Sequence, residues 1–210
     1  SVDTVLQPEV SAPGYNIISA NMGGGQVGTH KSGTSMAAPQ IAGVAALLKQ
    51  LRPNLHPLEI KSLIVNQSKS IQDKDGKDYP PIQQGAGRVQ TYQSAMAGVV
   101  VNPVAVSFGE LNLPGKSRAK IKAIRIKNTS KDTLNLDLSA SLGDGYKFKV
   151  QPSHLRLLAG KSRLIRVRLI LDPTKLTQPV NSVEAMITVK DQEDVLARVP
   201  ALAIVKKQSD

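Results

Sequence analysis

The hydrophobic pattern of this chain changes its period near Gly98, and this change constrains the fold more than any other feature. Before it, apolar residues crowd nearly every position of Ser35–Leu51, as in a helix buried on all sides, and Pro53 ends the run. After it, apolar and charged residues alternate, as in Ile165–Leu169. We therefore predict two domains: residues 1–97 with helices and strands, and residues 98–210 as an all-β sandwich of seven or eight short strands.

Shorter signals place the other elements of the first domain. Two short extended pieces are expected over Pro8–Gly14 and Tyr15–Ala20, because proline holds the residue before it away from helical conformations. A second helix is expected to start at Pro57, and a short one over Thr91–Ala97. In the second domain, the alternation slips at Ala123–Ile124, which predicts a β-bulge.

Charge is unevenly divided between the two halves. Residues 1–97 hold 8 Lys and Arg against 6 Asp and Glu, whereas 98–210 hold 19 against 10, which together give the net charge of +11. Aromatic residues make up only 3% of the chain, which leaves little support for stacking on bases, so nucleic acid is not an expected partner. The basic alternation is expected to form a solvated strand face, with contact to an anionic cell-surface polymer or lipid as the alternative. Its members are Arg118, Lys120, Lys122, Arg125, Lys127, Arg166 and Arg168.

Ser35 is the candidate catalytic residue, because it stands where a glycine-led turn meets the apolar helix. A hydroxyl at neutral pH needs a base to accept its proton and hydrogen-bond donors to hold the oxyanion. The first turn of a helix supplies unpaired N–H groups and the positive end of the helix dipole. A serine at that place can equally well cap the helix. Local chemistry leaves both interpretations open.

The segment Gly33–Pro39 (GTSMAAP), followed by Ile41–Leu48, closely resembles the nucleophile segment of the subtilisin-like serine proteases, or subtilases. Pro8–Gly14, Ile60–Ile64 and Gly85–Val89 resemble further segments of that catalytic domain, in the family's order and spacing. The resemblance implies that Ser35 is the nucleophile and that its own N–H is one oxyanion donor. It also implies that Gly33 and Thr34 form the turn that presents it. His30 and Lys31 are expected to line the leaving-group side of the substrate cleft.

The fold class follows from the same resemblance. Residues 1–97 are expected to be the C-terminal part of a subtilisin-like α/β domain, with most of its parallel sheet encoded upstream of residue 1. Val104–Gly109 and Val150–Leu157 resemble the fibronectin-III-like domain that follows the catalytic domain in cell-envelope proteinases and plant subtilases. The implied substrate is a protein or peptide, and the implied location is extracellular or in the cell envelope.

The residues before Ser35 depart from the family pattern. Subtilases carry Asp, then His, then an oxyanion Asn before the serine, and no residue of this chain matches those motifs. His30, His56 and His154 have no evident carboxylate to orient them, so none is expected to act as the base. The chain alone is therefore predicted to be inactive. A non-catalytic binding module, with the sandwich as its working part, stays open as the alternative.

Three further expectations concern partners and cofactors. The apolar sides of the helix are expected to seek the missing N-terminal part of the catalytic domain, a second copy of this chain, or the β domain. No metal site and no cofactor are predicted: Asp73-x-Asp75-Gly76 is interpreted as a tight turn, and calcium in the parent enzyme stays open. Gly23–Gly28 matches G-x-G-x-x-G without the strand and helix that a dinucleotide site needs.

Overall fold

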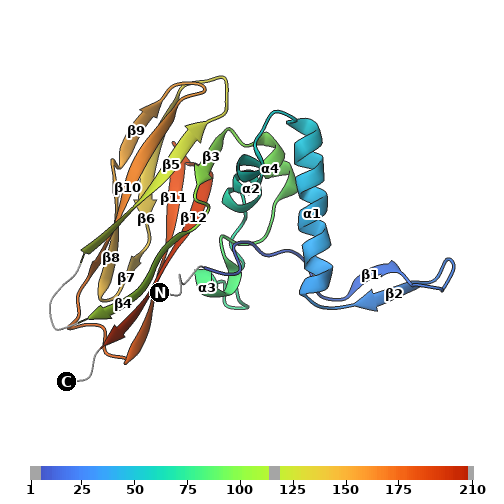
Figure 1. Cartoon of the computed structure of the whole chain (residues 1–210), viewed down its shortest axis with the longest axis horizontal. Coiled ribbons are helices and arrows are strands. Elements are labelled where there is room, and N and C mark those ends of the chain that lie inside the picture. Colours follow the sequence, from blue (N-terminus) through green and yellow to red (C-terminus); the bar gives the residue numbers. More distant parts are fainter. Residues whose placement is uncertain (1–5, 114–118, 208–210) are drawn as a thin grey trace.

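The computed structural model describes residues 6–113 and 119–207. A β-sandwich and a group of helices lie side by side, and a hairpin projects from the helices on the side away from the sandwich (Figure 1). The elements before the sandwich are β1 (Ile17–Ala20), β2 (Gly28–Lys31), α1 (Thr34–Leu51), α2 (Pro57–Asn66), α3 (Pro81–Gln84) and α4 (Thr91–Met96). No helix in the described part is both long and apolar enough to cross a membrane.

The sandwich consists of two five-stranded sheets within the described residues, in place of the seven or eight strands predicted. The first sheet has the order β3 (Val99–Asn102), β5 (Ala119–Asn128), β10 (Ser162–Leu171), β8 (Tyr146–Gln151), β7 (Leu142–Gly143). The second has the order β4 (Val106–Leu113), β12 (Asp194–Lys207), β11 (Val180–Asp191), β6 (Leu134–Ala140), β9 (His154–Leu157). Alternate residues of both sheets are buried between them, as the period of two predicted.

The bulge predicted at Ala123–Ile124 is wrong. Strands β5 and β10 pair without a register shift, and the irregularities fall between Val189 and Lys190 and between Leu202 and Ile204. The slip in the sequence pattern has a simpler cause, because Ile121 lies on the outer face of the sheet with 58% of its surface exposed.

The unbroken register also divides the predicted basic face. Lys122 lies opposite the buried Val167, whereas Arg125 lies opposite the exposed Leu164. Because side chains alternate between the two faces of a strand, Lys120 and Lys122 point to the inner side, and Arg125 and Lys127 to the outer side. Arg118, which the prediction grouped with them, lies outside the described residues.

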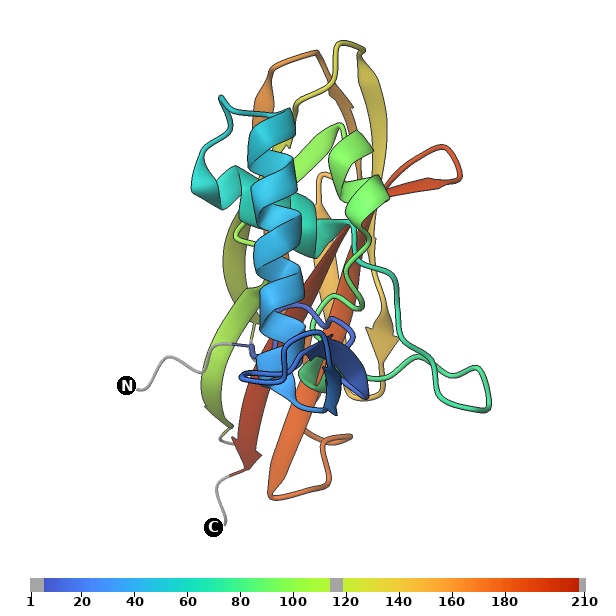
Figure 2. The same ribbon diagram turned by 90° about the vertical axis from the view of Figure 1, so that its right-hand side faces the viewer.

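Helix α1 is apolar on nearly every side, but only Val44 and Leu48 are buried in the described structure. These two residues pack against Ile60, Leu63 and Ile64 of α2. Figure 2, which views the molecule from the helical side, shows α1 in front of the sheets with its outer surface uncovered. Leu47 and Leu51 expose 57% and 60% of their surface. The expectation that this chain leaves the apolar sides of the helix uncovered is confirmed for the described residues.

The described residues do not form the parallel sheet expected around α1. Strands β1 and β2 make an antiparallel hairpin, and the parallel pair among the described strands, β4 with β12, belongs to the sandwich. The structure is thus mostly β, and its N-terminal part is a set of helices with one hairpin. A parallel α/β sheet needs several parallel strands with helices on both of its faces, and residues 6–97 supply only the antiparallel pair β1 and β2 as named strands.

The end of α2 joins the helices to the sandwich. The buried Asn66 side chain bonds both sheets: its Oδ1 accepts from the Val101 N–H at 2.9 Å, and its Nδ2 donates to the Arg198 carbonyl at 3.2 Å. At the other end of α2, Lys127 donates to Glu59, and this bond lowers the pKa of the Glu59 carboxyl. Neither Asn66 nor Glu59 was singled out by the sequence analysis, since an isolated polar residue carries no pattern.

Candidate active site

The turn between β2 and α1 holds the predicted site residues next to one another. Lys31 is the last residue of β2, Gly33 is the residue before the helix, and Thr34 and Ser35 begin it. Gly33 has φ 145° and ψ 170°, a conformation that residues with a side chain rarely adopt. The sequence therefore needs glycine two positions before Ser35 for the chain to enter the helix at this angle.

A neighbouring segment fixes this turn in place by three hydrogen bonds. The Gly33 N–H donates to the Gly14 carbonyl at 2.7 Å, the Asn16 N–H donates to the Ser32 hydroxyl at 2.9 Å, and Gln40 Nε2 donates to the Pro13 carbonyl at 2.7 Å. A Cβ on Gly14 would lie 2.8 Å from the Gly33 carbonyl oxygen, so glycine also permits this approach. Ser32 and Gln40 are thus positioning residues for the turn.

The capping interpretation of Ser35 is wrong for this structure. The residue at the N-cap is Gly33, and no side chain caps the helix. Ser35 is exposed, and within the described residues its hydroxyl makes no hydrogen bond. It lies on the first turn of an 18-residue helix that has no acidic residue in that turn, so the positive end of the dipole is not neutralised locally. This environment stabilises a negative charge that develops beside Ser35.

The three histidines lie in separate places, and none bonds Ser35 within the described structure. His30 is exposed on β2, opposite Ile18 of β1. His56 caps α2, where its Nδ1 accepts from the Leu58 N–H at 3.3 Å. The view that no histidine has a carboxylate partner is wrong for His154, because its Nδ1 contacts the Asp137 carboxylate from the neighbouring strand. That pair lies on strands β6 and β9 of the sandwich.

Asp73 closes the turn that was considered as a cation loop. One of its carboxylate oxygens, Oδ1, accepts from the N–H groups of both Asp75 and Lys77 at 2.9 Å. Gly76 follows with φ 78°. This arrangement is a local polar turn, as the sequence indicated.

The larger cavities do not coincide with Ser35. One of about 500 Å³ lies beside Gly143–Lys147 on the sandwich, and one of about 470 Å³ lies at the joint beside Asn66, Asp78 and Arg198. The chemistry that Ser35 can perform comes from its helix terminus and turn. Neither of these two cavities is lined by Ser35, so neither forms a substrate cleft beside it.

Ser35 is thus an exposed serine at the start of α1 whose hydroxyl makes no hydrogen bond within the described residues. Residues 1–87 match the sequence model of the subtilase family. Sequence relatives agree. The minor extracellular protease Vpr of Bacillus subtilis is 30% identical over 97% of this chain, and the subtilisin-like protease SBT1.2 of Arabidopsis thaliana is 34% identical over 60% of it.

The chain spans only part of these relatives, namely 25% of Vpr and 19% of SBT1.2. Among solved structures, the N-terminal domain of PorA overlaps 51% of this chain and 97% of its own at 10% identity, with a TM-score of 0.38. The periplasmic chaperone SfaE overlaps 53% of this chain and 59% of its own at 13% identity, with a TM-score of 0.34. The functional assignment below therefore starts from the subtilase match alone.

Proposed function

We propose that this chain is the C-terminal portion of a subtilisin-like serine endopeptidase in which Ser35 attacks the carbonyl carbon of a peptide bond. The observation that carries the proposal is the Ser35 hydroxyl itself, which is exposed and uncommitted at the start of α1 within a subtilase-family segment. Gly33 and Thr34 would shape the turn beside the substrate, and Lys31 would contact the leaving-group side. Residues 1–97 would complete an α/β catalytic domain, and residues 98–210 would form its fibronectin-III-like companion.

Acyl transfer by Ser35 requires groups that the described residues do not bring to Ser35. A base must accept the Ser35 proton as the new C–O bond forms, and the same group must then return it to the leaving amine. The Ser35 N–H would be one donor to the oxyanion, and an Asn side chain the second. The Asp, His and Asn would come from a region N-terminal to this chain, and the assembled enzyme would act on proteins outside the cell or in its envelope.

Covalent labelling of Ser35 tests this proposal. The chain alone should not react with a fluorophosphonate probe, because no base lowers the cost of removing the proton, and it should not cleave peptides. Joined to the upstream catalytic region, it should become labelled, and Ser35→Ala should remove the label and reduce peptide cleavage by at least about 10³-fold. Ser19→Ala, at an exposed serine of β1, is the control and should keep both. Absence of labelling in both forms would favour the binding-module alternative.

The uncovered side of α1 leads to a second expectation for the isolated chain. An apolar groove of about 440 Å³ lies between α1 and α2 and is lined by Val10, Ile41, Ala45, Ile60 and Ile64. In the complete enzyme, the N-terminal region would cover α1. Without it, we expect self-association in light scattering, and Leu47→Lys should shift the chain toward monomer because it places a charge on the exposed side of α1. A wild-type chain that stays monomeric at high concentration would contradict this expectation.

A further inference from the structure

The outer face of the sheet that contains β5, β10 and β8 carries an unusual arrangement of charge. The register pairs exposed residues across these strands: Arg125 with Leu164, Ala123 with Arg166, and Ile121 with Arg168. Lys149 continues the row of Arg168 onto β8. Directly paired residues of neighbouring strands share one face, so these side chains point to the same side of the sheet.

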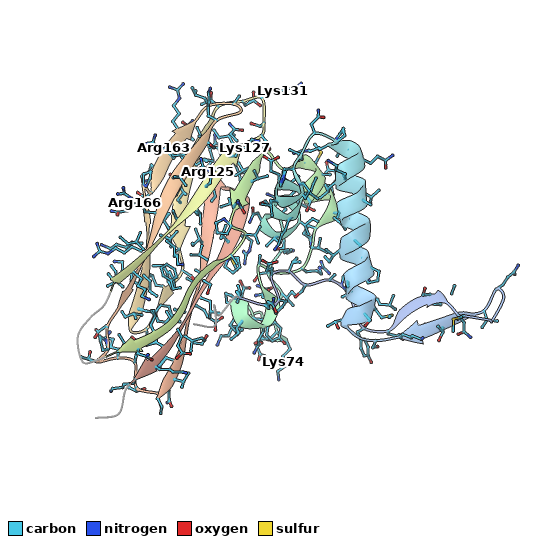
Figure 3. The ribbon with its side chains drawn as sticks, in the orientation of Figure 1. Lys74, Arg125, Lys127, Lys131, Arg163 and Arg166 are labelled. Atoms are coloured by element: carbon cyan, nitrogen blue, oxygen red, sulfur yellow. The ribbon has the colours of Figure 1, made fainter. Side chains whose placement is uncertain are left out.

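The cations on this face form one continuous stripe, which we call the basic stripe. Its members are Lys127 and Arg125 on β5, Arg166 and Arg168 on β10, and Lys149 and Lys147 on β8. Residues paired across β5, β10 and β8 form rows that run across the sheet, and five successive outward rows each contain at least one of these cations. The cations move from β5 to β10 to β8 along these rows, so the stripe crosses the sheet diagonally. Figure 3 shows Arg125, Lys127 and Arg166 on these strands. Rows two residues apart are separated by about 7 Å, which gives the stripe a length of about 27 Å.

Within the described residues, a carboxylate balances the basic stripe only at its Lys127 end. The outward positions of β5, β10 and β8 in the described structure hold no Asp or Glu, and of the six cations only Lys127 has an ion pair among the described residues, with Glu59 of α2. Arg168 even lies directly opposite Lys149. Like charges in directly opposed positions destabilise a sheet, so ordinary strand pairing does not account for this arrangement.

The other sheet of the sandwich shows the opposite pattern. There Lys190 lies opposite Asp137, Asp137 contacts His154, and Lys206 pairs with Glu110 at 2.8 Å. The same chain therefore places carboxylates beside the cations of one sheet and omits them from the other. The unpaired positive charge is therefore concentrated on the exposed face of one sheet.

We propose that the basic stripe binds a linear phosphate polymer that lies extended across the sheet. Arginine forks bind phosphate oxygens in pairs, and a row of cations spaced along a line matches a partner whose charges repeat along a chain. The outward positions of these strands carry no aromatic side chain, since Tyr146 and Phe148 lie in the inward row, so the surface offers no platform for stacking bases. The apolar side chains of this face are each paired with a cation: Ile121 with Arg168, Leu164 with Arg125, and Ile170 and Leu142 with Lys147. They therefore form no continuous apolar patch that could enter a bilayer. The proposal does not depend on catalysis by Ser35.

Binding of the whole 210-residue chain to fluorescently labelled, long-chain inorganic polyphosphate at several salt concentrations tests this proposal. The triple variant Lys149→Gln, Arg166→Gln and Arg168→Gln should lose about 100-fold or more in affinity. Three phosphate contacts fewer should also reduce the slope of log affinity against log salt by about 2. The matched control is Lys74→Gln, Lys77→Gln and Lys207→Gln, which removes the same charge at exposed lysines off the stripe; Figure 3 shows Lys74 beyond α3. This control should change the affinity less than about threefold, because its three lysines lie off the stripe and exposed charges distant from a bound polymer are screened by salt. Both variants lose the same net charge, so a difference between them reports the stripe itself.

Three results would overturn the proposal. The chain could show no binding to polyphosphate, or the control variant could weaken binding as much as the stripe variant, which would reduce the effect to net charge. The chain could also ignore polyphosphate and bind vesicles containing phosphatidylglycerol through the same three residues, which would assign the stripe to a membrane. Thermal unfolding of both variants verifies that they are folded, since all six substitutions are at exposed positions.

Discussion

Gly87→Ala should lower the free energy of unfolding by about 3 kcal/mol, because two separate penalties act at this position. Gly87 has φ 125°, which a residue with a side chain rarely adopts, and a Cβ there would lie 2.2 Å from the Lys69 carbonyl oxygen. The backbone cannot move away easily. Ser11 N–H donates to the Gly87 carbonyl at 2.8 Å, and Arg88 N–H donates to the Lys69 carbonyl at 2.7 Å.

Gly76→Ala is the matched control for this experiment. Gly76 also has a positive φ, of 78°, but a Cβ there would meet no atom within 4 Å. It should therefore show the conformational penalty alone, about 1 kcal/mol. Urea denaturation followed by circular dichroism measures both variants. An equal loss of unfolding free energy in the two variants would show that the close approach of Gly87 to the Lys69 carbonyl adds nothing to stability.

Asn66→Ala should destabilise the protein by about 2–4 kcal/mol and weaken the joint between helices and sandwich. The side chain is 1% exposed and satisfies two backbone groups from two different sheets, the Val101 N–H and the Arg198 carbonyl. Alanine cannot replace either bond, so a buried donor and a part-buried acceptor lose their partner. Ser62, which donates to the Val101 carbonyl at 3.0 Å, and Gln67, which donates to the Leu196 carbonyl, would remain as the nearby bonds.

Asn135→Ala provides the comparison for Asn66. Asn135 is exposed on β6, and its side chain makes no hydrogen bond in the described structure, so its loss should change stability by less than about 0.5 kcal/mol. The informative measurement is urea unfolding of both variants. A loss at Asn66 no larger than at Asn135 would show that the joint does not depend on this side chain.

Much of the fold could be predicted because it follows from local periodicity. Alternation over Ile165–Leu169 predicted a strand, the apolar run after Ser35 predicted a helix, and Pro57 marked the start of the next one. These signals come from neighbours in the sequence, and the structure agrees with them. The number of strands and the position of the bulges were predicted wrongly, because both depend on which strands pair.

The site divides in the same way. Glycine at position 33 and an apolar helix after Ser35 are local features, and they were sufficient to select Ser35 as the nucleophile candidate. The sequence could not decide between a capping role and an exposed hydroxyl, because that depends on the angle at which the chain enters the helix. Ser32, Gln40 and the segment around Gly14 hold that angle through contacts between residues distant in sequence.

The sequence by itself determined the two structural halves, the serine at the helix start and the excess of positive charge in the second half. Only the tertiary structure decided which cations share a surface, since a strand without a bulge sends Lys122 inward and Arg125 outward. It also decided that Asn66 joins the halves and that Gly87 must lack a side chain. The physical reason is that periodicity is a property of one segment, whereas register, burial and close approach arise only when two segments meet.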